Sequence, residues 1–186
     1  MKKLILASGS PNRKQILVDA GIDFEIDPSN YEEDMTLPMH PYELVKHLSE
    51  GKAKDVAVRY REGLVVGADS IVVFNEHLLG KPHTPERAKE MLKMLSGKSH
   101  EALTGFTVVD VEKNKIISKV VVTKVFFRNL SDAEIEAYVA TGEPLERAGA
   151  YAIQENGVKF VEKIEGSKAN VAGLPIEELL ETLKEF

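Results

Sequence analysis

The chain has 186 residues, a formal net charge of −6 at pH 7 and hydrophobic side chains at 43% of its positions. This composition predicts a folded domain with a packed core and excludes a chain that is disordered throughout. The acidic balance disfavours general nucleic-acid binding, which depends on a basic surface, but it is compatible with a small phosphate ligand held by a few cations. Because there is no cysteine, disulfides and thiolate metal sites are excluded.

The first apolar run of the chain is short. It extends from Leu4 to Ala7 and is followed at once by polar residues. A secretory signal peptide needs a longer apolar region, and no stretch of the sequence approaches the apolar length that spans a membrane. We therefore expect a cytoplasmic protein that makes no membrane contact.

The first half of the chain alternates between apolar runs and helical patterns. Ser10 is a suitable N-cap, Pro11 fits the first turn of a helix, and Gly21 is placed to end it. In chain order we expect a buried strand at residues 4–6, a helix from Pro11, a loop over residues 27–40, and a helix from Pro41 that breaks near Gly51.

The second half continues this alternation and adds β-branched segments of period two. Ser131 and Glu134 have the spacing of a capping box, which predicts that a helix begins there. We expect a strand at residues 64–66 that ends at Gly67-Ala68-Asp69, strand character again at 71–74, a helix from Pro85, strands near 107–109 and 120–127, a strand pair near Tyr151 and 158–164, and a helix from about Pro175. The whole is predicted to be one mixed α/β domain over residues 1–186.

The turn between the first strand and the first helix is the first candidate site. A helix N-terminus offers unpaired backbone N–H groups and partial positive charge, which suits it to bind phosphate. Ser8 and Ser10 can donate hydrogen bonds to phosphate oxygens, and Arg13 can bind them with two N–H groups. The alternative is an ordinary capped helix with a solvated arginine, and the spacing alone does not choose between the two.

Charged residues at other turns form a second set of candidates. Asp69 follows an apolar strand, where α/β proteins commonly place their sites, and it can bind Mg²⁺, accept a proton from water or simply cap a turn. The cluster Glu32-Glu33-Asp34 can hold a hard cation or form a solvated acidic loop. Lys52 and Lys81 can contact phosphates or lie on the surface as most lysines do.

Together these groups indicate phosphate chemistry without choosing the bond that is broken. Triphosphate hydrolysis needs cations to neutralise the phosphates, carboxylates to hold metal, and a base for water. The histidines show no zinc-site spacing and the serines no G-x-S-x-G elbow, which disfavours a zinc hydrolase and a serine hydrolase.

Several ordered motifs give the chain a more specific resemblance. They are Ser8-Gly9-Ser10-Pro11-Asn12-Arg13-Lys14, Gly67-Ala68-Asp69-Ser70, Leu79-Gly80-Lys81-Pro82, Ser96-Gly97-Lys98 with His100, Gly142-Glu143-Pro144-Leu145, the AGAYAIQ segment that ends at Gln154, and Val171-Ala172-Gly173-Leu174-Pro175. With these motifs in this order, the chain resembles the Maf family of nucleotide pyrophosphatases over nearly its whole length.

The resemblance implies a Maf/inosine-triphosphatase-like α/β fold, with an elongated mixed sheet, flanking helices and a deep cleft between two lobes. It also implies attack of water at the α-phosphorus of a nucleoside triphosphate, with release of pyrophosphate. Asp69 matches the proton acceptor of the family, and the other matching active-site positions are Ser8, Arg13, Glu33, Lys52 and Lys81. A divalent metal such as Mg²⁺, Mn²⁺ or Co²⁺ is then required, and we expect Glu33 and Asp69 to bind it.

Three positions indicate which nucleotides are hydrolysed. Ser70 after the aspartate and Gln154 in the later motif resemble the dTTP/UTP branch, and the amide of Gln154 offers the donor and the acceptor that a pyrimidine edge requires. Asn12 departs from this branch, which usually carries arginine there, so a charge and a bidentate donor are missing. The departure concerns the expected base preference and not the expected hydrolysis.

We therefore expect an enzyme that converts dTTP and UTP to the monophosphate and pyrophosphate, with modified nucleotides as further candidate substrates. The main alternative is a nucleotide-sensing regulatory protein, linked to cell division, that binds the same ligand without significant turnover. A nucleic-acid-associated role and a triphosphatase that releases orthophosphate are the others. A homodimer is the default expectation for its assembly.

Overall fold

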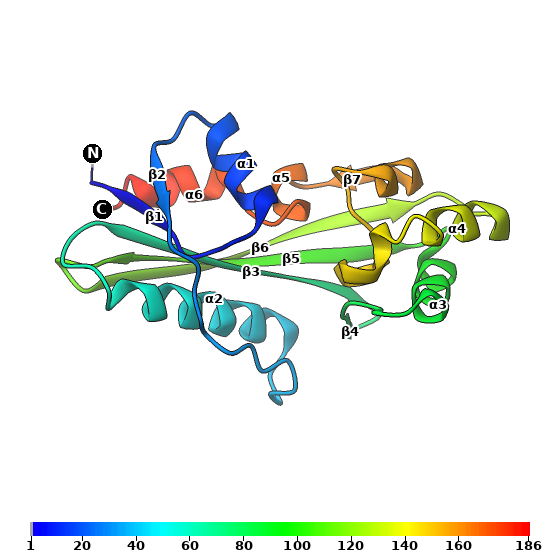
Figure 1. Cartoon of the computed structure of the whole chain (residues 1–186), viewed down its shortest axis with the longest axis horizontal. Coiled ribbons are helices and arrows are strands. Elements are labelled where there is room, and N and C mark those ends of the chain that lie inside the picture. Colours follow the sequence, from blue (N-terminus) through cyan, green and yellow to red (C-terminus); the bar gives the residue numbers. More distant parts are fainter. Residues whose placement is uncertain (1) are drawn as a thin grey trace. The chain divides into compact units, whose positions relative to one another are not determined.

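A computed structural model describes residues 2–186 as two compact units (Figure 1). Unit 1 comprises Met1–Ser70, Thr104–Val121 and Ala169–Phe186, and unit 2 comprises Ile71–Leu103 and Val122–Lys168. Three long strands, β3 (Leu64–Phe74), β5 (Ser99–Asp110) and β6 (Lys115–Phe127), contribute residues to both units. The expectation of one domain over residues 1–186 stays a prediction.

The strands form a 7-stranded sheet that is mixed, as the family resemblance implies. Its order is β2-β1-β3-β5-β6-β7, with β4 (His77–Leu79) paired to β3. β1 (Leu4–Leu6) is parallel to both β2 (Phe24–Ile26) and β3, whereas β4 and β7 (Val161–Glu165) pair antiparallel with β3 and β6. The carboxyl ends of the parallel strands β1, β2 and β3 therefore lie at the same edge of the sheet. α/β proteins commonly bind ligands at this edge.

Helices cover both faces of the strands in unit 1 (Figure 1). The helices are α1 (Pro11–Asp19), α2 (Pro41–Ala57), the short α5 (Lys168–Val171) at the unit boundary, and α6 (Ile176–Leu183). Leu4 and Leu6 pack in a core cluster with residues of α1 and α6, whereas Ile5 packs in a second cluster with residues of α2. Because both faces of β1 are buried, its sequence is a continuous apolar run and not an alternating one.

Two glycines allow α2 to approach the sheet closely. A Cβ atom at Gly67 of β3 would lie 2.5 Å from the carbonyl oxygen of Ser49, and a Cβ atom at Gly105 of β5 would collide with the carbonyl oxygen of Val45. Larger residues at either strand position would therefore push the helix away. α2 is one unbroken helix through Gly51, so the predicted break there is wrong. The buried face of α2, packed on the sheet, keeps the helix continuous despite the glycine.

Unit 2 contains α3 (Pro85–Leu95), α4 (Asp132–Val139) and three short 3-10 helices at residues 143–146, 148–150 and 156–160. The helix starts that the sequence predicts are confirmed. The hydroxyl of Thr84 caps α3 by accepting a hydrogen bond from the amide of Arg87. Ser131 and Glu134 form the predicted capping box of α4.

Two expectations about the strands are wrong. The strand predicted to end at Asp69 continues without interruption through β3, so this residue lies inside a strand. The residues around Tyr151 form no strand, because Gly149 and Ala150 adopt positive φ angles of 69° and 62° and turn the chain. In addition, β2 is a strand that the sequence pattern did not indicate.

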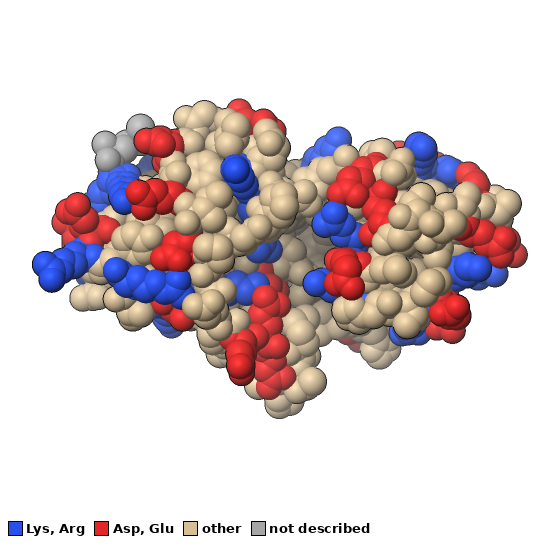
Figure 2. All heavy atoms as spheres, viewed as in Figure 1, with Lys and Arg blue, Asp and Glu red and all other residues tan. Residues whose placement is uncertain are grey.

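The surface carries charges of both signs. Figure 2 shows Lys and Arg side chains intermixed with Asp and Glu over the visible face. A surface of this kind differs from the continuous basic stripe typical of nucleic-acid-binding proteins. None of the described helices combines the length and the apolar character that crossing a membrane requires.

Candidate functional site

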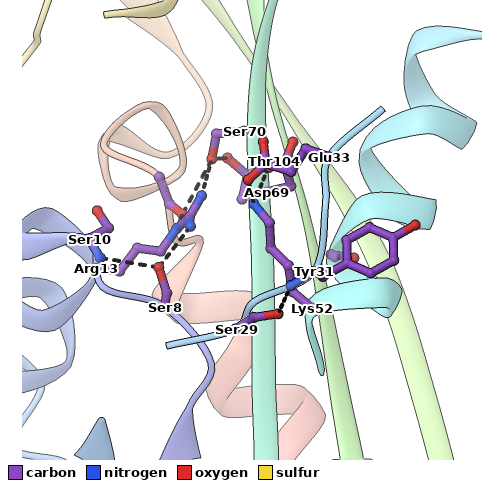
Figure 3. Close-up of polar contacts among 12 residues, drawn as sticks. Ser8, Ser10, Arg13, Ser29, Tyr31, Glu33, Lys52, Asp69, Ser70 and Thr104 are labelled. Atoms are coloured by element: carbon purple, nitrogen blue, oxygen red, sulfur yellow. Dashed lines mark hydrogen bonds and ion pairs between the residues drawn. The ribbon is translucent and has the colours of Figure 1, made fainter. Parts of the chain in front are cut away.

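The ammonium of Lys52 lies between two carboxylates in unit 1 (Figure 3). Its Nζ atom is 2.6 Å from Oδ1 of Asp69 and 2.6 Å from Oε1 of Glu33. The side chains of Lys52 and Asp69 are buried, with 10% and 7% of their surface exposed, whereas Glu33 is 46% exposed. The three charges therefore form a partly desolvated cluster that opens toward solvent at Glu33.

The pleat of β3 explains why Asp69 faces Lys52. Successive side chains of a strand point to opposite faces, so Val65, Gly67 and Asp69 share the face that α2 covers. Val65 packs in the α2 cluster, and Gly67 lets the helix backbone come close near Ser49. Lys52, on the inner face of α2, therefore reaches Asp69 while most of its side chain stays buried.

Burial sets the electrostatics of Asp69. Desolvation raises the pKa of this carboxyl above its ordinary value, and the positive charges of Lys52 and Arg13 oppose that rise. A buried carboxylate with a raised pKa and specific charged partners is a common feature of active sites. Such a group can accept a proton from water more readily than a solvated aspartate.

Arg13 of α1 is held by three oxygen atoms (Figure 3). Its Nε donates to the carbonyl of Gly173 at 2.8 Å, Nη1 donates to Oγ of Ser8 at 3.0 Å, and Nη2 donates to Oγ of Ser70 at 3.2 Å. Desolvation lowers the pKa of Arg13 and the charges of Asp69 and Glu33 raise it, but a guanidinium stays protonated at any neutral pH. The guanidinium is thus positively charged and held in one orientation.

A chain of hydroxyl groups extends this arrangement. Oγ of Ser70 lies 2.9 Å from Oγ1 of Thr104, which donates to the carbonyl of Asn170 at 2.9 Å. Neither Thr104 nor Gly173 was assigned a role from the sequence, although Gly173 lies in a motif that carries the family resemblance. Gly173 has a φ of 113°, which favours glycine, and this conformation presents its carbonyl to Arg13.

Hydrogen bonds order the turn between β1 and α1, which the sequence predicts as a phosphate-binding site. Ser8 is buried, and its Oγ accepts hydrogen bonds from Arg13 and from the amide of Ser10 at 3.3 Å. Ser10 is the N-cap of α1, but its side chain makes no capping hydrogen bond to the described backbone. Asn12 is half-buried in the first turn of α1. The start of α1 thus presents amide groups beside a fixed guanidinium, which suits an anion.

Of the three consecutive acids at residues 32–34, only Glu33 contacts Lys52. Glu33 bonds Lys52, while Asp34 accepts hydrogen bonds from the amide and the hydroxyl of Thr36. The exposed Glu32 is part of the same loop. The structure therefore brings the amino-terminal turn, Glu33 and Asp69 together in unit 1.

The remaining two predicted residues belong to unit 2. Lys81 is exposed, with Nζ 3.5 Å from Oε2 of Glu146. Gln154 is exposed in a turn that follows the buried Tyr151. Each is accessible to a ligand, and their roles stay predictions.

The carboxylates of Glu33 and Asp69 fit a metal site that water and substrate phosphates complete. Among residues 2–186, no cluster of three or more His, Cys, Asp or Glu side chains is arranged to hold a metal alone. Glu33 and Asp69 do converge on a single cation, the ammonium of Lys52. Mg²⁺ is commonly bound by one or two carboxylates together with water and substrate phosphates, so this donor set fits such an ion.

Comparisons with known proteins agree over the full chain. The model for Maf-like proteins matches residues 3–186. A dTTP/UTP pyrophosphatase of Methanosarcina barkeri is 49% identical over 177 residues, which cover 95% of this chain and 90% of the relative. The dTTP/UTP pyrophosphatases of Methanococcoides burtonii and Bacillus cereus (strain ATCC 10987 / NRS 248) are 46% and 45% identical over 100% of this chain, and 96% and 91% of the relatives are covered.

A solved structure supports the fold independently. The Ham1 protein of Staphylococcus aureus matches 99% of this chain and 99% of its own, with a TM-score of 0.50 and 14% sequence identity. At that identity the likeness concerns the fold alone. It confirms the α/β fold class that the sequence predicts.

Proposed function

Because this chain belongs to the Maf family, we propose that it is a nucleoside triphosphate pyrophosphatase that hydrolyses dTTP and UTP to the monophosphate and pyrophosphate. The observation that carries the proposal is the Asp69–Lys52–Glu33 cluster next to the Arg13 guanidinium. These groups supply both requirements of the reaction, namely a base for water and positive charge for the phosphates.

Asp69 is the proposed base. A water molecule attacks the α-phosphorus, its proton passes to the Asp69 carboxylate, and the bond between the α-phosphorus and the bridging oxygen breaks, so that pyrophosphate leaves. Arg13 and the start of α1 bind the phosphates, with Ser8 and Ser10 as further hydrogen-bond donors. Because Arg13 is already held by three acceptors, it loses little freedom when the substrate binds.

Two lysines complete the proposed charge balance. Lys52 keeps a positive charge beside Asp69, and Lys81 of unit 2 is proposed to contact the leaving pyrophosphate. A divalent cation, Mg²⁺, Mn²⁺ or Co²⁺, bound by Glu33 and Asp69 with substrate oxygens, would supply further neutralisation of phosphate charge.

The base preference is proposed to depend on Gln154, Ser70 and Asn12. Support comes from the relatives, which are named for dTTP and UTP hydrolysis. Gln154 offers both a donor and an acceptor, as a pyrimidine edge requires, and Ser70 connects the site to Arg13. Asn12, in the first turn of α1, provides an amide where a charge would otherwise lie.

A substrate panel tests the proposal. Purified protein is incubated with canonical and modified nucleoside triphosphates in the presence of Mg²⁺, Mn²⁺ or Co²⁺, and pyrophosphate and orthophosphate are both measured. The proposal expects metal-dependent pyrophosphate release that is fastest with dTTP and UTP. Failure of these two nucleotides alongside success of another refutes the base preference, and orthophosphate as the product refutes the bond assignment.

The same panel separates the enzyme from a nucleotide-sensing protein. A sensor needs Arg13 and the lysines for binding but has little use for a desolvated carboxylate such as Asp69. Tight binding of a triphosphate without turnover would therefore favour the sensor. A homodimer and a cytoplasmic location also stay part of the proposal, and analytical ultracentrifugation tests the first of them.

A further inference from the structure

The loop that carries Glu33 is anchored to α2 by a contact that the proposed function does not use. The ring of Tyr31 lies directly over Gly51, so that a Cβ atom at Gly51 would be 2.6 Å from both Cε1 and Cε2 of Tyr31 and would collide with Cζ. Any residue larger than glycine therefore displaces this ring. Oη of Tyr31 also lies 3.2 Å from Nε2 of His47, one helical turn before Gly51.

Hydrogen bonds on either side of Tyr31 extend this anchor along one face of α2. Asp55 accepts from the hydroxyl of Ser29 and from the amide of Asn30, both at 2.8 Å. The hydroxyl of Ser29 in turn accepts from the amide of Tyr31 at 3.0 Å. The α2 residues 47, 51 and 55 are four apart, so they form one stripe on the helix surface.

The anchor ends where the charge cluster begins. Glu33, two residues after Tyr31, bonds Lys52, which follows Gly51 in α2. Glycine inside a helix is unfavourable compared with alanine, and close approach of another group is a usual reason for its presence. Here the group that approaches is Tyr31.

We propose that Tyr31 and Gly51 are positioning residues that set the Glu33 carboxylate beside Lys52 and Asp69, and thereby set the affinity of this site for its divalent cation. The inference rests on the proposed function, because that function makes Glu33 a metal ligand. It adds that the loop must be docked on α2 for Glu33 to lie close to Asp69.

Gly51→Ala is the most informative variant, because its effects on the fold and on the site have opposite signs. Alanine favours the helix, and the displaced group is the mobile end of one side chain, so the unfolding temperature stays equal to the wild type or rises. Loss of Tyr31 docking frees Glu33, so the Mn²⁺ concentration for half-maximal dTTP turnover increases about tenfold, with kcat at saturating metal changed less. Lys46→Ala, on the exposed face of α2, is the matched control and leaves both quantities unchanged.

A second readout does not depend on activity. Amide hydrogen exchange of the metal-free protein reports the docking of the loop, because the amides of Asn30 and Tyr31 are hydrogen-bonded in the docked form. Gly51→Ala should accelerate exchange in the segment 30–33. Tyr31→Ala should do the same, and the double variant should be no worse than Tyr31→Ala alone, because the collision partner is already gone.

Wild-type metal dependence and wild-type exchange in Gly51→Ala would overturn the positioning role. Additive effects in the double variant would also overturn it, because they would mean that Gly51 does not act through Tyr31. If the wild-type protein hydrolyses no nucleoside triphosphate, the proposed function fails. The exchange measurement then still decides whether Gly51 docks the loop.

Discussion

Asp69 and Ser70 are neighbours in β3 whose side chains contact opposite layers of unit 1. Asp69 bonds Lys52 of α2, whereas Ser70 accepts a hydrogen bond from Arg13 of α1. The alternation of the strand thus places the Asp69 carboxylate and the Arg13 guanidinium on two sides of a single backbone segment. This relationship links the acid–base part and the binding part of the proposed mechanism.

Replacing Lys52 by methionine removes the cation that compensates the buried Asp69. Because the carboxylate would then be desolvated without its nearest partner, Lys52→Met should lower the free energy of unfolding by about 3 kcal/mol at neutral pH. Urea denaturation monitored by circular dichroism measures this loss. The double variant Lys52→Met/Asp69→Asn should recover part of it. An additive result would mean that the two side chains are not coupled.

Arg13→Lys keeps the charge but loses the planar arrangement of donors. A lysine cannot reproduce the three hydrogen bonds to Gly173, Ser8 and Ser70. With one or two charge-assisted hydrogen bonds lost, kcat/KM for dTTP should fall by about 10–100-fold. Steady-state kinetics check this, with Lys14→Arg in the same helix as a control. A normal kcat/KM in Arg13→Lys would exclude a bidentate role.

We expect Glu143 to hold the segment that carries Gln154 in place by hydrogen bonds. Its carboxylate accepts hydrogen bonds from Tyr138 at 2.7 Å, from the side chain of Asn156 at 2.8 Å, and from the amides of Asn156 and Gly157. Desolvation opposes its ionisation, but these hydrogen bonds together lower the pKa of Glu143. The Glu143 carboxylate therefore holds the residues that directly follow Gln154 in the chain.

Glu143→Gln keeps the shape of this acceptor and removes its charge. We expect KM for dTTP and UTP to rise about tenfold, with a smaller change in kcat, because the binding of the base is loosened and the chemistry is not. The measurement compares kcat and KM for dTTP, UTP and a purine triphosphate, with Glu136→Gln on the exposed side of α4 as the control. Equal losses for all nucleotides would indicate a general structural role.

His100 should make the stability of the protein depend on pH. It is buried between Phe127 and Tyr151, its Nδ1 has no hydrogen-bond partner among the described residues, and burial lowers its pKa to about 4. The ordinary pKa of histidine is about 6.5, so between these values the unfolded chain binds the proton and the folded chain does not. The contribution of His100 is therefore fully present above pH 6.5 and is lost as the pH falls toward 4.

From pH 7 to pH 5 this group should cost about 2 kcal/mol of unfolding free energy. Urea denaturation at the two pH values measures the difference. In His100→Gln the difference should shrink by that amount, whatever the absolute stability of the variant, whereas the exposed His40→Gln should retain it. An unchanged pH dependence in His100→Gln would show that His100 does not remain neutral in the folded protein.

The sequence was sufficient for the features that depend on local chemistry. The capping box at Ser131 and the helix start at Pro85 are confirmed, because each depends on residues close together in the chain. The strand at residues 4–6 is confirmed as well, since an apolar run between polar segments is buried wherever the sheet forms. The family motifs supplied the fold class, which is confirmed, and the predicted site residues as a set.

Features that depend on tertiary contacts were not accessible in the same way. In the sequence, Gly51 suggests a helix break. In the structure, α2 is continuous and the ring of Tyr31 occupies the space where a Cβ atom at Gly51 would lie. In the sequence, Asp69 resembles the end of a strand because the small residues Gly67 and Ala68 precede it. In the structure, Gly67 leaves room for the backbone of α2, and Ala68 is buried in a core cluster. The role of Thr104, which joins Ser70 to Asn170, depends on residues far apart in sequence.

The most direct measurement is hydrolysis of dTTP in ¹⁸O-labelled water by the wild type and by Asp69→Asn, with product masses recorded. We expect the wild type to release unlabelled pyrophosphate and dTMP that carries the ¹⁸O, because water attacks the α-phosphorus in the proposed reaction. We expect Asp69→Asn to remain folded and to lose about 10²–10⁴-fold in turnover, because the proposed base is gone. Label in pyrophosphate or orthophosphate would refute attack at the α-phosphorus, and near-normal pyrophosphate release by Asp69→Asn would refute the role of Asp69 as the base.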